Sequence, residues 1–215
     1  MTNRFDDVAA EWDQVPLRVR MAEVLAGEMI RHLDPRPGQI VMDYGTGTGL
    51  IALKLCPHVA KVVAADTSEG MLAVLREKIS QAGITTIEPR RWGIDQDPDD
   101  LPGFDAVVSS MTLHHIKDTS AVARAFYRLL VPGGRIALAD LDEENGDFHG
   151  NAQATEHNGF NRAALRAVFD QAGFTGLEFH DAHTVVKPLA DGREKPFSIF
   201  LLTGSKPVDA TRERR

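Results

Sequence analysis

The sequence predicts a single α/β domain with a mainly parallel sheet. Apolar runs of strand length alternate with amphipathic segments of helical spacing along most of the chain, and this alternation is typical of a parallel sheet covered by helices on both faces. Two late apolar runs, at residues 176–187 and 196–204, are joined by a short turn with no helix between them. We therefore expect them to form an antiparallel hairpin at the sheet edge.

The order of the other elements follows from the same patterns and from the residues that break them. Helical spacing predicts a helix over residues 5–33, which Pro16 breaks or restarts and which residues 34–38 end. Further strands are expected at residues 40–44, 61–66, 85–92, 104–111 and 135–141, and further helices at 48–56, 68–82, 118–130 and 162–172. Residues 95–103, 131–134 and 143–160 have the composition of turns and loops, and residues 207–215 are expected to form a flexible tail.

Composition and charge exclude several classes of protein. The 215 residues include 24 Lys and Arg against 31 Asp and Glu, a formal net charge of −7, and an acidic domain does not attract nucleic acid. No stretch approaches the ~20 apolar residues that span a bilayer, and the first residues lack the apolar core of a signal peptide. The one cysteine, Cys56, excludes an intrachain disulfide and a cysteine-based zinc site. We expect a cytoplasmic monomer or homodimer without a membrane partner.

Residues 43–49 form a glycine-rich turn between the first strand of the expected sheet and the helix after it. Glycines at positions 45, 47 and 49 let the backbone approach a ligand closely. A dinucleotide-binding loop has the spacing G-x-G-x-x-G, but position 50 is Leu50, and the carboxylate of Asp43 precedes the turn. That carboxylate would repel a pyrophosphate and suit an ammonium group. The turn therefore favours a cationic adenosyl ligand, and a simple connection between two elements is the alternative.

Two more carboxylates follow strands of the expected sheet. Asp66 ends the second strand, where a carboxylate can accept both ribose hydroxyls, or it can cap the helix that begins near Ser68. Asp95 follows the third strand, where it can accept from an adenine amine with Ile94 flanking the ring, or it can be an ordinary residue of an acidic loop. The carboxyl ends of parallel strands are where ligands bind in such sheets.

Three histidines are candidates for a general base or a substrate contact. His115 follows the fourth strand beside His114, and packing is the alternative role for this adjacent pair. His149 and His157 lie in the long loop after the fifth strand, and long loops in compact domains are often functional. His115, His149 and His157, with Glu143 or Asp140, could ligate a metal, but their spacing matches no short metal motif. We therefore expect no metal site.

At this point the chain resembles the class I S-adenosylmethionine-dependent methyltransferases over about residues 36–142. The segments that carry the resemblance are VMDYGTGTG, VVAADTSEGML, FDAVVSSMTLHHI and LLVPGGRIALADL. In style the chain is similar to the small-molecule branch that includes ubiquinone and menaquinone biosynthesis enzymes. The resemblance implies a Rossmann-like, seven-stranded, mostly parallel sheet in the order 3-2-1-4-5-7-6, with strand 7 antiparallel. It also implies one domain over residues 1–206, with a helical lid at 1–34 and a core at 38–206.

The resemblance further implies an enzyme that binds S-adenosyl-L-methionine and releases S-adenosyl-L-homocysteine. By this resemblance the cofactor is bound by residues of the strand ends and the lid: Asp43, Gly45, Thr46, Gly47, Asp66, Thr67, Met71, Ile94, Asp95, Ser109, Trp12 and Arg18. The implied reaction is in-line methyl transfer to a small molecule. Departures from the family pattern are Tyr44, which replaces a smaller or aliphatic residue, and the absence of an alanine after Asp95.

Other functions stay open at this stage. The chain could be a non-catalytic S-adenosylmethionine-binding regulator, or a methyltransferase that acts on a macromolecule. Residues 109–112 read Ser-Ser-Met-Thr and not Asn-Pro-Pro-Tyr, which disfavours one subclass of N-methyltransferases. The single cysteine disfavours an arsenite methyltransferase, and Asp43 with Leu50 argues against a nicotinamide-dependent oxidoreductase.

Overall fold

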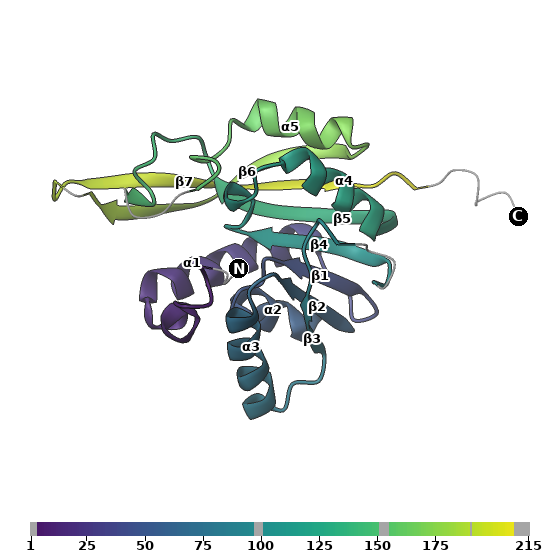
Figure 1. Ribbon diagram of the computed structural model, residues 1–215. Helices are drawn as coiled ribbons and strands as arrows, with labels where there is room; N and C mark the ends of the chain where they lie inside the picture. Colours follow the sequence, from purple (N-terminus) through teal and green to yellow (C-terminus); the bar gives the residue numbers. More distant parts are fainter. Residues whose placement is uncertain (1–3, 97–100, 151–154, 190, 209–215) are drawn as a thin grey trace, which may run out of the picture.

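The fold is a doubly wound α/β sheet, seen in a computed structural model that describes residues 4–96, 101–150, 155–189 and 191–208 (Figure 1). The sheet has seven strands in the order β3-β2-β1-β4-β5-β7-β6. β7 is antiparallel to both of its neighbours, and the pairs among β1 to β5 are parallel. The strand order and the antiparallel seventh strand that the sequence motifs implied are therefore confirmed.

The elements keep the order that the sequence predicts. The strands are β1 (Ile40–Tyr44), β2 (Lys61–Asp66), β3 (Ile87–Arg91), β4 (Phe104–Ser110), β5 (Leu130–Leu141), β6 (Thr175–Pro188) and β7 (Glu194–Ser205). The α-helices are α1 (Pro16–Leu33), α2 (Leu50–Leu55), α3 (Glu69–Ala82), α4 (Thr119–Leu129) and α5 (Arg162–Gln171). Short 3₁₀ helices are η1 (Ala9–Gln14), η2 (Cys56–His58) and η3 (Leu113–His115).

Two apolar layers hold the helices on the sheet. One layer joins α1 and α2 to one face, and the other joins α4 and α5 to the opposite face. Successive strand residues serve the two layers in turn, because side chains of a strand point to alternate faces. In β1, for example, Val41 packs in the first layer and Met42 in the second. This double burial is why the central strands are mainly apolar.

Local signals in the sequence place the helix ends. Pro16 is the first residue of α1, where its missing N–H leaves no bond unmade. The Ser68 hydroxyl caps α3 by accepting from the N–H of Met71 at 3.1 Å, and Gly83 ends that helix. The Asn161 side chain caps α5 by accepting from the N–H groups of Ala163 and Ala164, as the sequence predicts.

Two segments differ from the prediction. Residues 5–8 are turn and not helix, and helical backbone begins with η1. Residues 131–134 are not a free turn before β5, because β5 already begins at Leu130 and bulges between its pairings with Phe104 and Ala106 of β4. The N–H of Gly133 and the carbonyl of Gly134 bond to Lys206, which extends the ladder past this bulge.

The long loop after β5 returns along the β6–β7 hairpin, which extends well beyond the other strands (Figure 1). Phe148 packs edge-on against Phe197 of β7, with ring centroids 5.2 Å apart, and Lys195 bonds to Asp147 at 2.7 Å. The N–H of Phe160 then bonds to the carbonyl of Leu141 at 2.9 Å. These contacts fix the described parts of the loop over the carboxyl ends of the central strands.

Parts of several predicted segments lie outside the described residues. They are residues 1–3 of the predicted lid, 97–100 of the acidic loop, 151–154 of the long loop, 190 of the turn before β7, and 209–215 of the tail. Among the described residues, no helix combines the length and the apolar character needed to cross a bilayer.

The return of the loop at Gly159 leads to a prediction about stability. Gly159 has a φ of +75°, and a Cβ at this position would lie 2.1 Å from the carbonyl oxygen of Asp142. We expect Gly159→Ala to lower the free energy of unfolding by about 2 kcal/mol or more, because it adds strain and a backbone clash. Gly38→Ala is the matched control, since its Cβ would meet nothing within 4 Å. Urea unfolding measures both, and equal stabilities of the two variants would contradict the prediction.

Candidate active site

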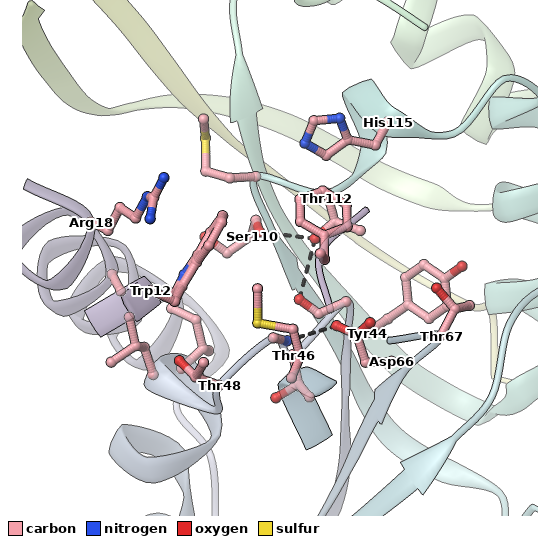
Figure 2. A pocket seen from close by; sticks show the side chains of 18 of the residues that line it. Trp12, Arg18, Tyr44, Thr46, Thr48, Asp66, Thr67, Ser110, Thr112 and His115 are labelled. Atoms are coloured by element: carbon pink, nitrogen blue, oxygen red, sulfur yellow. Dashed lines mark hydrogen bonds between the residues drawn. The ribbon is translucent and has the colours of Figure 1, made fainter. Parts of the chain in front are cut away.

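A cavity of about 570 Å³ opens at the carboxyl ends of the central strands. Figure 2 shows Trp12 and Arg18 on one side of it, Asp66 and Thr67 across from them, and His115 at the far end. The described residues that line it are Arg4, Phe5, Trp12, Arg18, Met21, Ala22, Tyr44, Gly45, Thr46, Gly47, Thr48, Leu50, Ile51, Asp66, Thr67, Met71, Trp92, Ser110, Met111, Thr112, His115, Ile116 and Glu156.

The glycine-rich turn after β1 forms the floor of this cavity. The N–H groups of Gly45 and Thr46 donate to the carbonyl of Ala65 at 2.8 and 3.0 Å, so the turn is held to the end of β2. A Cβ on Gly45 would lie 2.3 Å from the Thr112 side chain, whereas one on Gly47 would meet only the Met71 sulfur, at 3.9 Å. Gly45 therefore serves protein packing, and Gly47 leaves its space to the cavity.

Asp66 joins the turn to the end of β2. One carboxylate oxygen accepts the N–H of Gly47 at 2.8 Å, and the other accepts the N–H of Ser68 at 2.8 Å. Burial raises the pKa of Asp66, and these backbone hydrogen bonds oppose that shift because they favour the charged form. Asp66 is therefore placed for either predicted role. It lines the cavity, as the ribose contact requires, and it bonds to the backbone where α3 begins, as a cap would.

Asp43 lies behind the turn and is not among the described lining residues. It is 1% exposed, and its carboxylate accepts the hydroxyl hydrogen of Thr46 at 2.7 Å. Burial raises the pKa of Asp43 to about 7, and the nearby Asp66 adds to the shift. Asp43 therefore influences the cavity indirectly. It orients the hydroxyl of Thr46, which lines the cavity, and its charge contributes to the electric field there.

The N-terminal segment is fixed across the cavity by two carboxylates. Asp6 accepts the hydroxyl of Ser68 at 2.6 Å and the N–H of Gly70 at 2.9 Å, both at the start of α3. Asp13, in η1, accepts the hydroxyl of Thr48 at 2.6 Å and pairs with Lys78. This segment brings Phe5, Trp12 and the Arg18 of α1 to the cavity.

Four histidine and aspartate side chains meet beside the cavity. Asp140, at the end of β5, is fully buried, and its carboxylate lies 2.6 Å from Nδ1 of His114. The Nε2 atoms of His114 and His149 are 3.1 Å apart. His115 lines the cavity, and Arg4 donates to its Nδ1 at 2.7 Å. Burial, with the nearby imidazoles and Arg4, lowers the pKa of His115 to about 2, so its imidazole is neutral.

The structure brings most of the sequence-predicted residues to one place. Eight of the predicted cofactor residues line the cavity: Gly45, Thr46, Gly47, Asp66, Thr67, Met71, Trp12 and Arg18. Asp43, Ile94, Asp95 and Ser109 are not among the described lining residues. The Ser109 hydroxyl donates to the Tyr44 carbonyl at 2.8 Å, and Ser110 lines the cavity in its place. Asp95 lies beside Gly93, since a Cβ on Gly93 would be 2.8 Å from the Asp95 carboxylate.

Of the three candidate histidines, His115 is among the described lining residues. His149 is not among them, but its ring lies beside that of His115, with centroids 5.5 Å apart. His157 is not among them either, and its Nε2 donates to the carbonyl of Ile116 at 3.0 Å.

Sequence reasoning missed several lining residues. Arg4, Phe5, Tyr44, Trp92, Thr112 and Glu156 belong to this group. Tyr44 lies inside the quoted segment VMDYGTGTG and Trp92 lies at the end of the predicted third strand, and their rings meet edge-on with centroids 5.9 Å apart. Arg4 and Glu156 carried no local signal, because their positions depend on tertiary contacts of the N-terminal segment and the long loop.

Comparisons with known proteins agree with this geometry. Residues 41–134 match the family model described as a methyltransferase domain. An uncharacterized methyltransferase of Schizosaccharomyces pombe is 34% identical over 66% of this chain, and a ubiquinone biosynthesis O-methyltransferase of Pseudomonas paraeruginosa is 31% identical over 59% of it. The matches span 56% and 51% of the lengths of these two relatives, so the chain covers about half of each.

A solved structure shows the same fold. Phosphoethanolamine N-methyltransferase 2 of Haemonchus contortus, in complex with S-adenosyl-L-methionine, has a TM-score of 0.69 and 16% identity, covering 96% of this chain and 60% of that one. The strand order and the glycine turn define an α/β domain with a cavity at the strand ends, where ligands bind in such sheets. The family match covers β1 to β4 together with the glycine turn and Asp66, so over these residues the chain is similar to methyltransferase domains.

The raised pKa of Asp43 leads to a prediction about pH. Its ordinary value is 3.8, and its value here is about 7. At pH values between these two, the folded protein keeps a proton on Asp43 that the unfolded chain has released. The contribution of the raised pKa to the free energy of unfolding is therefore complete below about pH 4 and is lost as the pH rises to about 7. Asp43→Asn removes the titration and keeps an acceptor for Thr46. We expect the Tm of this variant, relative to the wild type, to increase between about pH 4 and pH 8.

Thermal unfolding without cofactor measures this difference. Asp34→Asn is the control, because Asp34 is exposed and its backbone has the positive φ of 44° that asparagine tolerates. A Tm difference for Asp43→Asn that is the same at both pH values would contradict the assignment.

Proposed function

We propose that this chain transfers a methyl group from S-adenosyl-L-methionine to a small-molecule acceptor by in-line displacement. The observation that carries the proposal is the joint position of the glycine turn and Asp66 on one cavity, within the residues that match the methyltransferase model. The cavity volume of about 570 Å³ is within the roughly 300–1,000 Å³ of small-molecule sites.

The cofactor's parts have distinct partners in this proposal. Asp66 accepts the ribose hydroxyls, since a carboxylate at the end of the second strand suits that role. The adenine lies toward Trp92, Ile94 and Asp95 beyond Asp66. The methionine end lies over Gly45, Gly47 and Thr46, with the charge of Asp43 behind Thr46 favouring its ammonium group. Support for this orientation comes from the lining residues and from the space that Gly47 leaves open.

The acceptor occupies the other end of the cavity. Phe5, Met111 and Ile116 give that end an apolar surface, and Arg4 and His115 supply polar groups. These groups fit a small, largely apolar acceptor with an oxygen or another hydrogen-bonding atom. One relative is named for ubiquinone biosynthesis, which supports the same class of acceptor for this chain.

The chemistry needs alignment more than it needs a reactive side chain. The sulfonium of the cofactor is the activated leaving group, so the protein must align the acceptor atom, the methyl carbon and the sulfur, and must exclude water. The N-terminal segment, held by Asp6 and Asp13, is the lid that excludes water in this proposal. A general base works best with a pKa near the working pH, and the pKa of His115 is about 2. His115 is therefore assigned to hydrogen bonding with the acceptor.

Cofactor binding is the first test. Trp12 and Trp92 are the two tryptophans of the sequence, and both line the cavity, so fluorescence reports on binding. We expect S-adenosylmethionine and S-adenosylhomocysteine to change the emission, and Asp66→Asn to weaken binding by about tenfold to a hundredfold, as for a lost hydrogen bond to a charged group. Asp34→Asn should bind as the wild type does. Absence of binding below about millimolar concentration, confirmed by calorimetry, would overturn the proposal.

The lid contact is a second test. Asp13→Asn removes the pair with Lys78 and weakens the bond from Thr48, so the lid should open more often and cofactor should dissociate faster. We expect an increase in the dissociation constant of about threefold to tenfold. Glu23→Gln is the matched control, because Glu23 pairs with Lys54 on an exposed surface of α1 outside the cavity lining. Stopped-flow fluorescence gives the rates, and equal rates for both variants would contradict a lid.

Transfer itself is tested with labelled cofactor. Incubation of the protein with a set of phenols, quinols and amines, and with methyl-labelled S-adenosylmethionine, should label one class of small molecule. A protein that binds the cofactor and labels no small molecule would be a regulator or would act on a macromolecule, and either result would overturn the proposed acceptor class.

A further inference from the structure

We propose that His114, His115 and His149 form a binding site for a divalent transition-metal ion of the Zn²⁺ type at the acceptor end of the cavity. Each of the three histidines offers a ring nitrogen, and these nitrogens all lie within 4.8 Å of one another. The site adds to the proposed function, and its first test needs neither cofactor nor acceptor.

The geometry of His114 and His149 fits two ligands of one ion. Their Nε2 atoms are 3.1 Å apart. Two nitrogens at about 2.0–2.1 Å from a tetrahedral zinc ion are about 3.3 Å apart, so a small movement of the rings admits the ion. An N–H···N hydrogen bond between the two rings is the competing explanation of the same distance.

Asp140 prepares His114 for such a role. Its carboxylate is fully buried and lies 2.6 Å from Nδ1 of His114, so the ring proton is on Nδ1 and the lone pair of Nε2 faces His149. A carboxylate that holds the second nitrogen of a metal-binding histidine is the usual outer partner in such sites. Asp140 also accepts the N–H groups of Leu141 and His114, so its own position is fixed.

The fold brings the three rings together from two separate segments. His114 and His115 lie in η3 after β4, and Asp140 ends the neighbouring strand β5. His149 comes from the long loop, next to Phe148, which packs on Phe197 and whose carbonyl accepts from Lys187. This explains why the sequence shows no short metal motif, since the ligand spacing is made by tertiary contacts.

His115 links the ion to the cavity and to the N-terminal segment. Arg4 donates to Nδ1 of His115 at 2.7 Å, and a guanidinium can only donate. Metal binding by His115 competes with this contact. If Nδ1 binds the ion, its lone pair is no longer available to Arg4. If Nε2 binds the ion, Nδ1 carries the ring proton and cannot accept from Arg4.

Three protein ligands leave one tetrahedral position for another group, as in catalytic zinc sites. His115 lines the cavity, so an ion held by it would lie at the end assigned to the acceptor. An ion there would bind the acceptor's oxygen and lower its pKa. That assignment rests on the proposed function.

The test is titration of the tag-free, full-length chain with Co²⁺ and Zn²⁺ after treatment with a chelator. We expect one ion per chain and, with Co²⁺, the visible absorption of a tetrahedral nitrogen site. His149→Ala should lose this absorption and weaken binding at least a hundredfold. Asp140→Asn should weaken binding tenfold to a hundredfold, as for loss of an outer partner. His58→Ala is the matched control, because His58 is exposed in η2 and should bind as the wild type does.

Arg4→Ala separates this site from adventitious binding to surface histidines. Removal of the competing positive charge should tighten Co²⁺ binding by about threefold or more. Binding that is equal in the wild type and in His149→Ala, or no binding by the wild type below about millimolar concentration, would overturn the metal site and support the N–H···N bond. Cofactor binding measured separately would still stand in that case, so failure of the site and failure of the proposed function are distinguishable.

Discussion

The bonds between the glycine turn and the end of β2 are the constraint on which the site depends. Gly45 and Thr46 donate to the carbonyl of Ala65, and Gly47 donates to the carboxylate of Asp66. These bonds use the turn's N–H groups within the protein and fix its curvature, so the space above Gly47 has a defined shape. Asp66 also accepts from Ser68, and through that bond the start of α3 is fixed against the same turn. One carboxylate therefore positions two walls of the cavity.

Carboxylates also anchor the N-terminal segment, by hydrogen bonds to elements that are distant in the sequence. Asp6 binds the first turn of α3 through Ser68 and Gly70, and Asp13 binds the glycine-turn segment through Thr48. A Cβ on Gly70 would lie 2.8 Å from Cα of Asp6, so the close approach needs a glycine there. The anchors of the segment thus lie on the same elements that bind the proposed cofactor. In the proposed function, the lid and the cofactor site are therefore anchored to the same two elements.

The sequence was sufficient for the order of the elements and for eight of the twelve predicted cofactor residues to lie on the cavity. Strand positions and helix caps depend on local patterns, such as the apolar run of β1 and Asn161 before α5, and both are confirmed. The strand order followed from the resemblance to the methyltransferases and is also confirmed. The strand ends then brought Gly45, Gly47 and Asp66 together. The structure places Ser110 at the cavity and not the predicted Ser109, whose hydroxyl bonds to the backbone. Neighbouring side chains of a strand point to opposite faces, so an error of one residue selects the wrong face. The contact of His149 with His114 depends on how a long loop packs, and no local pattern encodes that packing.

The carboxylates near the proposed cofactor position suit methyl transfer in the proposed orientation. Asp66 lines the cavity there, and Asp43 is buried behind Thr46. Around Met111 and Thr112 the lining is neutral, and the other end has the guanidinium of Arg4, the neutral ring of His115 and Glu156, whose N–H donates to the carbonyl of His114. Positive charge on the sulfur fades in the transition state, so an anion in direct contact with it would stabilise the ground state more. In the proposed orientation, the carboxylate that binds the ribose and the buried charge behind Thr46 are set apart from the sulfur, so they add affinity without raising the barrier. The same reasoning places any activation of the acceptor at the histidine end, where it acts on the atom that gains the methyl group.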